Sequence, residues 1–135
     1  MSELNAGMRA FLEERRFGVL ATVGTTGWPR QTVMWYLLDG DEIVFNTARG
    51  RRKPENLARD PRVSMLVFDA YSFVRVSGRA RETATGDIAL ADIHRLAVRY
   101  DGEESAARGM ERFRKDERIT YRFRIERVYA STDLR

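Results

Sequence analysis

The 135-residue sequence contains no cysteine and a single histidine, His94. Without cysteine there can be no disulfide, no thiolate metal site and no cysteine nucleophile. One histidine leaves few ligands for a dedicated transition-metal site, so we predict no metal. No acid or serine stands at a telling distance from His94, and we predict that it is a surface residue of a helix rather than a catalytic base.

Long apolar runs are also missing. The N-terminal stretch mixes acids and bases where a signal peptide would carry an apolar segment, and no run is long enough to span a bilayer. We therefore expect a cytoplasmic protein with no membrane partner.

Hydrophobic residues make up 43% of the chain and charged residues 33%, a composition that suits a packed interior. The length suits one domain, which we expect to span residues 1–135. The formal net charge is +4 and the pI is about 9.8. An anionic partner is therefore plausible, and the positions of the charges must show which kind.

The spacing of apolar residues predicts a helix, three hairpin-linked strands, a short helix, two strands, two helices and a final strand. The predicted ranges are, in that order, 4–12, 17–23, 30–39, 42–47, 54–60, 62–69, 73–81, 86–100, 104–114 and 118–130. Short connections imply antiparallel pairing. Residues 30–39 alternate so that both faces are expected to be largely covered, which favours a small closed or split barrel over an open sheet.

The segment NTARGRRKPENLARDP, residues 46–61, places three arginines and a lysine around Gly50, between a strand and a short helix. Backbone amides, a helix N-terminus and these cations together suit an anion such as a phosphate. Asn56, one helical turn further on, could donate to the same group. The alternative is a solvated, charged loop, because runs of charge are usually solvated.

Several motifs occur here in an order that resembles one known family. They are the turn Gly27-Trp28-Pro29, the strand end Val33–Tyr36, the T-x-x-G-R-x-K segment Thr47–Lys53, and Asn56, Leu57, Asp60 and Pro61. The sequence resembles the split β-barrel flavin and deazaflavin proteins related to pyridoxamine 5'-phosphate oxidase, specifically members that use coenzyme F420. The resemblance implies a mainly β (α+β) fold, a six-stranded antiparallel split β-barrel of the FMN-binding type with flanking helices.

The resemblance also implies where a coenzyme binds. The strand residues Gln31, Thr32, Val33, Met34 and Trp35 would line its ring. The phosphate or charged tail would be held at the basic segment by Asn46, Thr47, Arg51, Arg52, Lys53 and Asn56. Family sites are completed across a twofold interface, so the resemblance implies a homodimer in which Tyr71, Ser72 and Phe73 of the second subunit contribute.

The expected activity is that of an F420-dependent (deazaflavin) oxidoreductase, which transfers a hydride to an unsaturated or carbonyl-containing small-molecule substrate. The cofactor carries such chemistry, which agrees with the lack of a recognisable nucleophile or base, and the catalytic residues are unassigned. Three alternatives are open: an FMN-dependent oxidase or reductase on the same barrel, a non-catalytic F420 carrier, and a basic nucleic-acid binder.

A second basic stripe is expected on two strands. It consists of Arg75, Arg79, Arg81, Arg122 and Arg124. Because acids dilute it and no recognition helix accompanies it, we predict a solvated or salt-bridged surface and no nucleic-acid partner. Of the aromatic residues, we expect Trp35 and Tyr71 to lie near the site.

Overall fold

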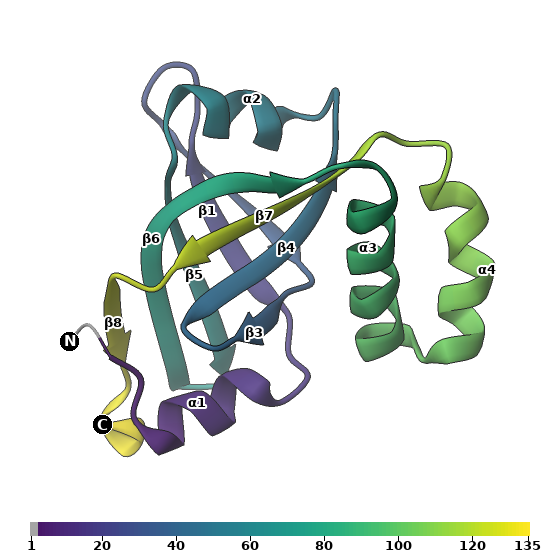
Figure 1. Cartoon of the computed structure of the whole chain (residues 1–135). Helices are drawn as coiled ribbons and strands as arrows, with labels where there is room; N and C mark the ends of the chain where they lie inside the picture. The colour runs from purple at the N-terminus through teal and green to yellow at the C-terminus, as the bar shows by residue number, and fades with distance from the viewer. Residues whose placement is uncertain (1–2) are drawn as a thin grey trace.

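The computed structural model describes residues 3–135, and over this range eight antiparallel strands form a barrel-like sheet (Figure 1). The strands are β1 (Gly18–Val23), β2 (Pro29–Met34), β3 (Leu37–Asp39), β4 (Glu42–Ala48), β5 (Arg62–Asp69), β6 (Ser72–Ala84), β7 (Arg118–Arg124) and β8 (Arg127–Ala130). Their order is β2-β1-β5-β6-β7-β4-β3, and β8 pairs with β6. The predicted α+β fold with an antiparallel split β-barrel is confirmed.

The strand count of six is wrong because two predicted strands each divide. The stretch 30–39 leaves β1 after Met34 and joins β4 as β3, which moves it to the other part of the sheet. The stretch 118–130 divides at Ile125 and Glu126. Its first part, β7, pairs with β4 and the second half of β6, and its last part, β8, pairs with the first half of β6.

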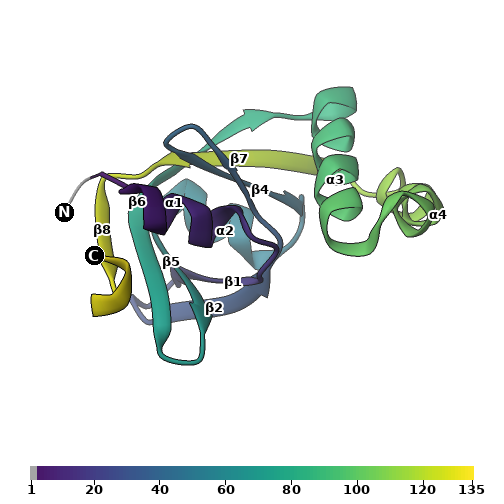
Figure 2. The same cartoon turned by 90° about the horizontal axis from the view of Figure 1, so that it is seen from below.

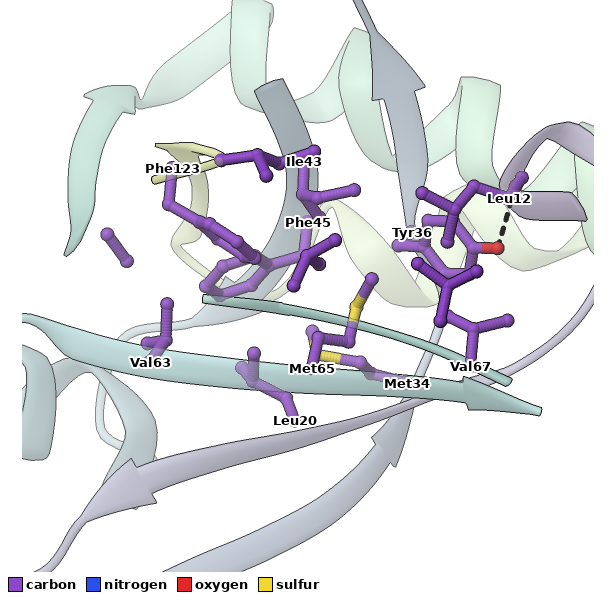
Figure 3. Packing of buried hydrophobic residues seen from close by; sticks show 14 of the residues in the cluster. Leu12, Leu20, Met34, Tyr36, Ile43, Phe45, Val63, Met65, Val67 and Phe123 are labelled. Atoms are coloured by element: carbon purple, nitrogen blue, oxygen red, sulfur yellow. Dashed lines mark hydrogen bonds between the residues drawn. The ribbon is translucent and has the colours of Figure 1, made fainter. Parts of the chain in front are cut away.

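The barrel interior is filled by alternate residues of the strands, as the period of two predicts. On β6, Val74, Val76 and Ala80 point inward and are buried. Figure 3 shows the packing of this core around Phe45, Met65 and Phe123. Tyr36 is fully buried among these side chains, and its hydroxyl donates to the carbonyl of Leu12 at 2.7 Å.

Helices close the two ends of the barrel. The helix α1 (Ala6–Glu13) lies across one end and α2 (Arg52–Arg59) across the other, as the two views in Figures 1 and 2 agree. The apolar side of α1, with Met8, Phe11 and Leu12, is buried in the core. Within residues 3–135, no helix is long and apolar enough to cross a membrane.

The remaining two helices, α3 (Gly86–Asp101) and α4 (Glu103–Phe113), form a hairpin beside the barrel (Figure 1), and a one-turn 3-10 helix, η1 (Thr132–Leu134), ends the chain. The buried stripe of α3 includes Ile93, Leu96, Ala97 and Tyr100. The first three of these side chains pack with α4 into a second, smaller hydrophobic cluster, which Trp35 and Leu37 join from the barrel side. The helix hairpin therefore rests on the strand break between β2 and β3.

Two burial predictions need correction. Residues 29–33 of β2 are exposed in the single chain, because β2 lies at the edge of the sheet. Arg118 and Thr120, which the alternation within residues 118–130 places on the polar side of the predicted last strand, are buried at 5% and 1% exposure. They are covered because α3 packs against β7 and β4 at this place.

Candidate functional site

A cleft of about 590 Å³ lies where the basic segment, the barrel wall and the helix hairpin meet. Strands β2 and β4 supply one wall, α3 and α4 the facing wall, and the start of α2 one end. The lining residues are Phe17, Val33, Met34, Trp35, Asn46, Thr47, Arg51, Lys53, Ile93, Leu96, Arg112, Phe113, Asp116 and Arg118. One side is thus apolar and aromatic, and the other is cationic.

The cationic end is built by the turn that follows β4. Gly50, at a φ of 89°, reverses the chain in a conformation that favours glycine, and α2 then begins at Arg52 rather than at the predicted Pro54. Arg51 is therefore the N-cap residue, and Lys53 lies in the first turn of the helix. Cations beside a helix N-terminus add to its positive potential, so an anion is favoured here.

Lys53 is half-buried and Arg51 is exposed. Neither forms a salt bridge with any residue of the described chain. Burial lowers the pKa of the Lys53 ammonium, and the neighbouring Arg51 guanidinium lowers it further. The cationic form of Lys53 is therefore poorly compensated in the free protein. A bound anion would supply the missing partner.

Arg49, the remaining arginine of this segment, has a different role. Its guanidinium donates to Glu82 and to Glu117, each at 2.8 Å, and these carboxylates raise the pKa of Arg49. The basic segment therefore divides into one arginine that ties strands together and cations that face the cleft.

A buried arginine forms the floor of the cleft. Arg118 donates from Nε to the Oδ1 of Asn46 at 2.9 Å and from Nη1 to Asp116 at 3.3 Å. The amide nitrogen of Asn46 in turn donates to the Ala89 carbonyl and to the hydroxyl of Thr120. Asn46 is thus engaged with the protein at both ends of its side chain.

Three aromatic rings stack beside the apolar side of the cleft. The ring of Tyr100 stands 5.4 Å from Trp35 and 5.4 Å from Phe17, with interplanar angles of 5° and 20°. Trp35 and Phe17 both line the cleft, whereas Tyr100 is buried. The stack fixes the orientation of the aromatic wall.

The structure brings together half of the residues predicted to bind a coenzyme. Those that line the cleft are Val33, Met34, Trp35, Asn46, Thr47, Arg51 and Lys53. Those that lie outside its lining are Gln31, Thr32, Arg52, Asn56, Tyr71, Ser72 and Phe73.

Each residue outside the lining has a definite place. Gln31 and Thr32 are exposed on the edge strand β2, and Arg52 is exposed at the start of α2. Asn56 lies on the buried side of α2, and its Oδ1 accepts a hydrogen bond from Arg59 at 2.9 Å. Tyr71 lies in the turn between β5 and β6, and Ser72 and Phe73 begin β6, so their contribution to a second subunit stays a prediction.

Sequence reasoning missed the wall made by the helix hairpin. The residues missed are Phe17, Ile93, Leu96, Arg112, Phe113, Asp116 and Arg118. The spacing of apolar residues predicts the helix at 86–100, but nothing in that spacing shows which strand the helix covers. No local signal singles out Arg118, because the alternation of the last strand assigns it to the polar side together with Thr120.

The other charged candidates lie away from the cleft. Arg79, Arg81 and Arg122 of the basic stripe form salt bridges with Glu126, Glu42 and Asp39, in agreement with the predicted salt-bridged surface. His94 is partly exposed on α3 and faces a separate groove between the helices. Among residues 3–135 no three potential metal-ligating side chains of the His, Cys, Asp and Glu types lie together.

Comparison with known proteins identifies relatives over nearly the whole chain. Residues 4–131 match the family model described as pyridoxamine 5'-phosphate oxidase. A solved structure of an F420 reductase is 27% identical, with a TM-score of 0.74, and the match covers 93% of this chain and 98% of that one.

Two further solved structures extend the comparison. A conserved hypothetical protein from Mycobacterium tuberculosis is 28% identical with a TM-score of 0.74, and the match covers 95% of this chain and 88% of that one. The heme storage protein of Vibrio cholerae is 17% identical with a TM-score of 0.70, over 95% of this chain and 94% of that one. The last similarity shows the shared fold alone.

Proposed function

From the premise that the chain belongs to the pyridoxamine 5'-phosphate oxidase family, we propose that it is an F420-dependent oxidoreductase that reduces an unsaturated or carbonyl-containing organic molecule. One observation carries the proposal: the cations Arg51 and Lys53 stand without acidic partners among the described residues, at one end of a cleft whose other side is aromatic and apolar. A coenzyme with an acidic end and a flat ring has the matching chemistry.

The residues present fit the acidic end of such a coenzyme. Lys53 and Arg51 can each pair with a phosphate oxygen, and Arg51 can do so with two donors. Thr47 adds a hydroxyl from β4 in the same lining. The lowered pKa of Lys53 supports this role, because an anion would relieve the penalty that burial and Arg51 impose on its charge.

F420, when bound, supplies hydride chemistry at its ring, and the protein supplies binding, orientation and a shielded surface. Trp35 and Val33 offer a flat apolar surface for a ring at the barrel wall. Ile93 and Leu96, on the facing helix, exclude water from the space between. No side chain of the cleft is assigned as a proton donor.

Charge favours F420 over FMN. Among the described lining residues, four are cationic and Asp116 alone is acidic, a formal excess of three positive charges. The single phosphate of FMN would neutralise part of that excess, whereas the phosphodiester and glutamyl tail of F420 bring several negative charges. The 27% identity to an F420 reductase over nearly the full chain supports the same choice.

A titration of the purified chain with each coenzyme tests the proposal. We expect F420 to bind with micromolar or tighter affinity and FMN to bind more weakly. The fluorescence of each coenzyme measures its binding. FMN binding without F420 binding would reverse the choice of coenzyme. Bound F420 that never reduces any member of a panel of enones, quinones and other carbonyl compounds would indicate a carrier.

We also propose that the protein acts as a homodimer. The outward face of β1, β2 and β5 is apolar, since Val33 pairs with Val19, and Val19 with Leu66, across neighbouring strands. Val33, Phe68 and Tyr71 are 67, 51 and 95% exposed in the single chain. A second copy on this face would bury apolar area and stand beside the cleft, which Val33 also lines.

Sedimentation of the wild type and of Val19→Glu checks this assembly. We expect a dimer at micromolar concentration for the wild type and a monomer for the variant, because a carboxylate between Val33 and Leu66 would be buried at the contact without a partner. Arg124→Glu, an exposed charge change on the distant β7, serves as the control and should leave the dimer intact. A wild-type monomer would contradict the proposal.

A further inference from the structure

Arg118 is 5% exposed and yet lines the cleft. A buried guanidinium usually has each of its donors paired, because an unpaired buried charge is costly. Here Nε and Nη1 donate to Asn46 and Asp116, and Nη2 makes no hydrogen bond to any residue of the described chain. The guanidinium is therefore fixed on one side, and on the other its Nη2 is open to the cleft, where a ligand can reach it.

The neighbours of Arg118 leave it short of negative charge. Burial lowers its pKa most, and Arg51 and Arg112 lower it further, against the opposing effect of Asp116. Asp116 stands at 3.3 Å, a long contact for a charge-assisted hydrogen bond. The single carboxylate of Asp116 does not balance the positive charges of Arg118, Arg51 and Arg112.

The support for Arg118 continues into α3. The Oδ1 of Asn46 holds Nε, the amide of Asn46 donates to the hydroxyl of Thr120, and that hydroxyl donates to Asp92 at 2.7 Å. Strands β4 and β7 and helix α3 are thereby joined by the half-buried Asn46 and the buried Thr120 and Asp92. Such a network orients a side chain more narrowly than an exposed arginine could be oriented.

Apolar surface adjoins the free side of this arginine. The guanidinium carbons of Arg118 and Arg112 lie 5.2 and 5.1 Å from the centre of the Phe113 ring. Ile93 and Leu96 line the same cleft from α3. An anionic group next to a flat apolar body would match this combination.

We propose that Arg118 and Arg112 form a carboxylate-binding site at the α4 end of the cleft, in addition to the site at Arg51 and Lys53, and that it takes a carboxylate attached to an apolar body. The inference rests on the proposed function for the identity of that body. The carboxylate belongs either to the organic substrate or to the acidic tail of the coenzyme, and the two sources share one recognition chemistry. Asn46 is then a positioning residue that orients Arg118.

The first experiment uses the coenzyme-free protein and the probe 1-naphthoate, with neutral 1-naphthalenemethanol as its matched partner. We expect saturable naphthoate binding that shifts the Nε–H NMR signal of Arg118, and weaker binding of the alcohol. Arg112→Gln should weaken naphthoate binding roughly tenfold, the scale of one charge-assisted hydrogen bond. Arg112 is exposed, so this variant should fold even if Arg118→Gln does not.

Arg114→Gln provides the control, because Arg114 is an exposed residue two positions further along that lines the separate groove near His94. It should leave naphthoate affinity unchanged. Asn46→Leu removes the partner of Nε and should weaken naphthoate binding while broadening the Arg118 signal, a change that lost packing alone would not produce.

The second experiment distinguishes the two sources by titrating F420 and a deazaflavin that lacks the phosphate and glutamyl tail. If Arg112→Gln weakens F420 binding but not binding of the tail-less compound, the tail supplies the carboxylate. If Arg112→Gln weakens the binding of naphthoate but not of F420, the substrate supplies the carboxylate. Equal binding of naphthoate and the alcohol, or no effect of Arg112→Gln on naphthoate or F420, would overturn the site. If the protein binds naphthoate but not F420, the proposed function is contradicted and the carboxylate site is not.

Discussion

The hydroxyl of Tyr100, near the end of α3, donates to the backbone carbonyl of Arg16 at 2.6 Å and accepts from the amide of Tyr36 at 3.2 Å. These bonds anchor the ring against which Trp35 and Phe17 stack. The buried side chain of Tyr100 therefore couples the helix hairpin to the aromatic wall of the cleft.

Removing this ring should disturb the wall. We expect Tyr100→Ala to destabilise the fold by about 3–5 kcal/mol, the range for truncating a buried aromatic residue. In a Trp28→Phe background, Trp35 is the sole tryptophan, and its emission should shift to longer wavelength in the variant as the stack is lost. Tyr100→Phe keeps the ring and should leave the emission close to that of the parent. An unchanged emission in Tyr100→Ala would show that the stack does not hold Trp35.

Lys53 should contribute directly to coenzyme affinity. Replacing Lys53 with alanine should weaken F420 binding by about 1 to 3 kcal/mol, the range for a hydrogen bond to a charged group. Isothermal titration at low salt measures the change, with Arg124→Ala as a control of equal charge outside the cleft. A dissociation constant that matches the wild type would remove Lys53 from the site.

The lowered pKa of Lys53 predicts a pH-dependent stability. Since burial and then Arg51 disfavour the ammonium in the folded chain, the unfolded chain binds more protons between the folded-state pKa and the ordinary lysine value. The contribution of this group to the free energy of unfolding therefore rises with pH in that window. At pH 7 the free energy of unfolding, measured with urea, should be larger for Lys53→Met than for the wild type. The difference should shrink as the pH approaches about 10.4, the ordinary pKa of lysine. An advantage that grows with pH would contradict this sign.

The barrel closure depends on Gly78, where β6 passes from β5 to β7. A Cβ at this position would overlap the carbonyl oxygen of Arg124, which is backbone and cannot turn away. Gly78→Ala should therefore cost roughly 1–3 kcal/mol by overpacking, and thermal unfolding measures the loss. Gly7→Ala, whose φ is not positive and whose added Cβ meets only ordinary van der Waals contacts, separates the clash from the general effect of replacing a glycine. Equal losses in the two variants would show that the close approach is unimportant.

The sequence predicted most elements because strand alternation and helical spacing are local signals. The buried residues 74, 76 and 80 follow the alternation of the strand predicted at 73–81, and Arg51 and Lys53 lie at the start of the short helix. The breaks at Trp35 and Ile125 were missed, because a strand that changes partners keeps its local pattern.

The arginine floor of the cleft was also beyond local reasoning. Arg118 belongs to a strand whose alternation assigns it to the polar side, and only the α3–α4 hairpin, which packs there through long-range contacts, buries it. Asn46 was selected as a coenzyme ligand, whereas its amide and carbonyl both bond to the protein. Which polar residue supports another is a tertiary property.

A crystal structure of the protein grown with excess F420 tests the coenzyme assignment. We predict that the phosphate of the coenzyme lies beside Lys53 and Arg51 at the start of α2, with its ring along β2 near Trp35. A structure in which this cleft stays empty while the coenzyme binds elsewhere would contradict it.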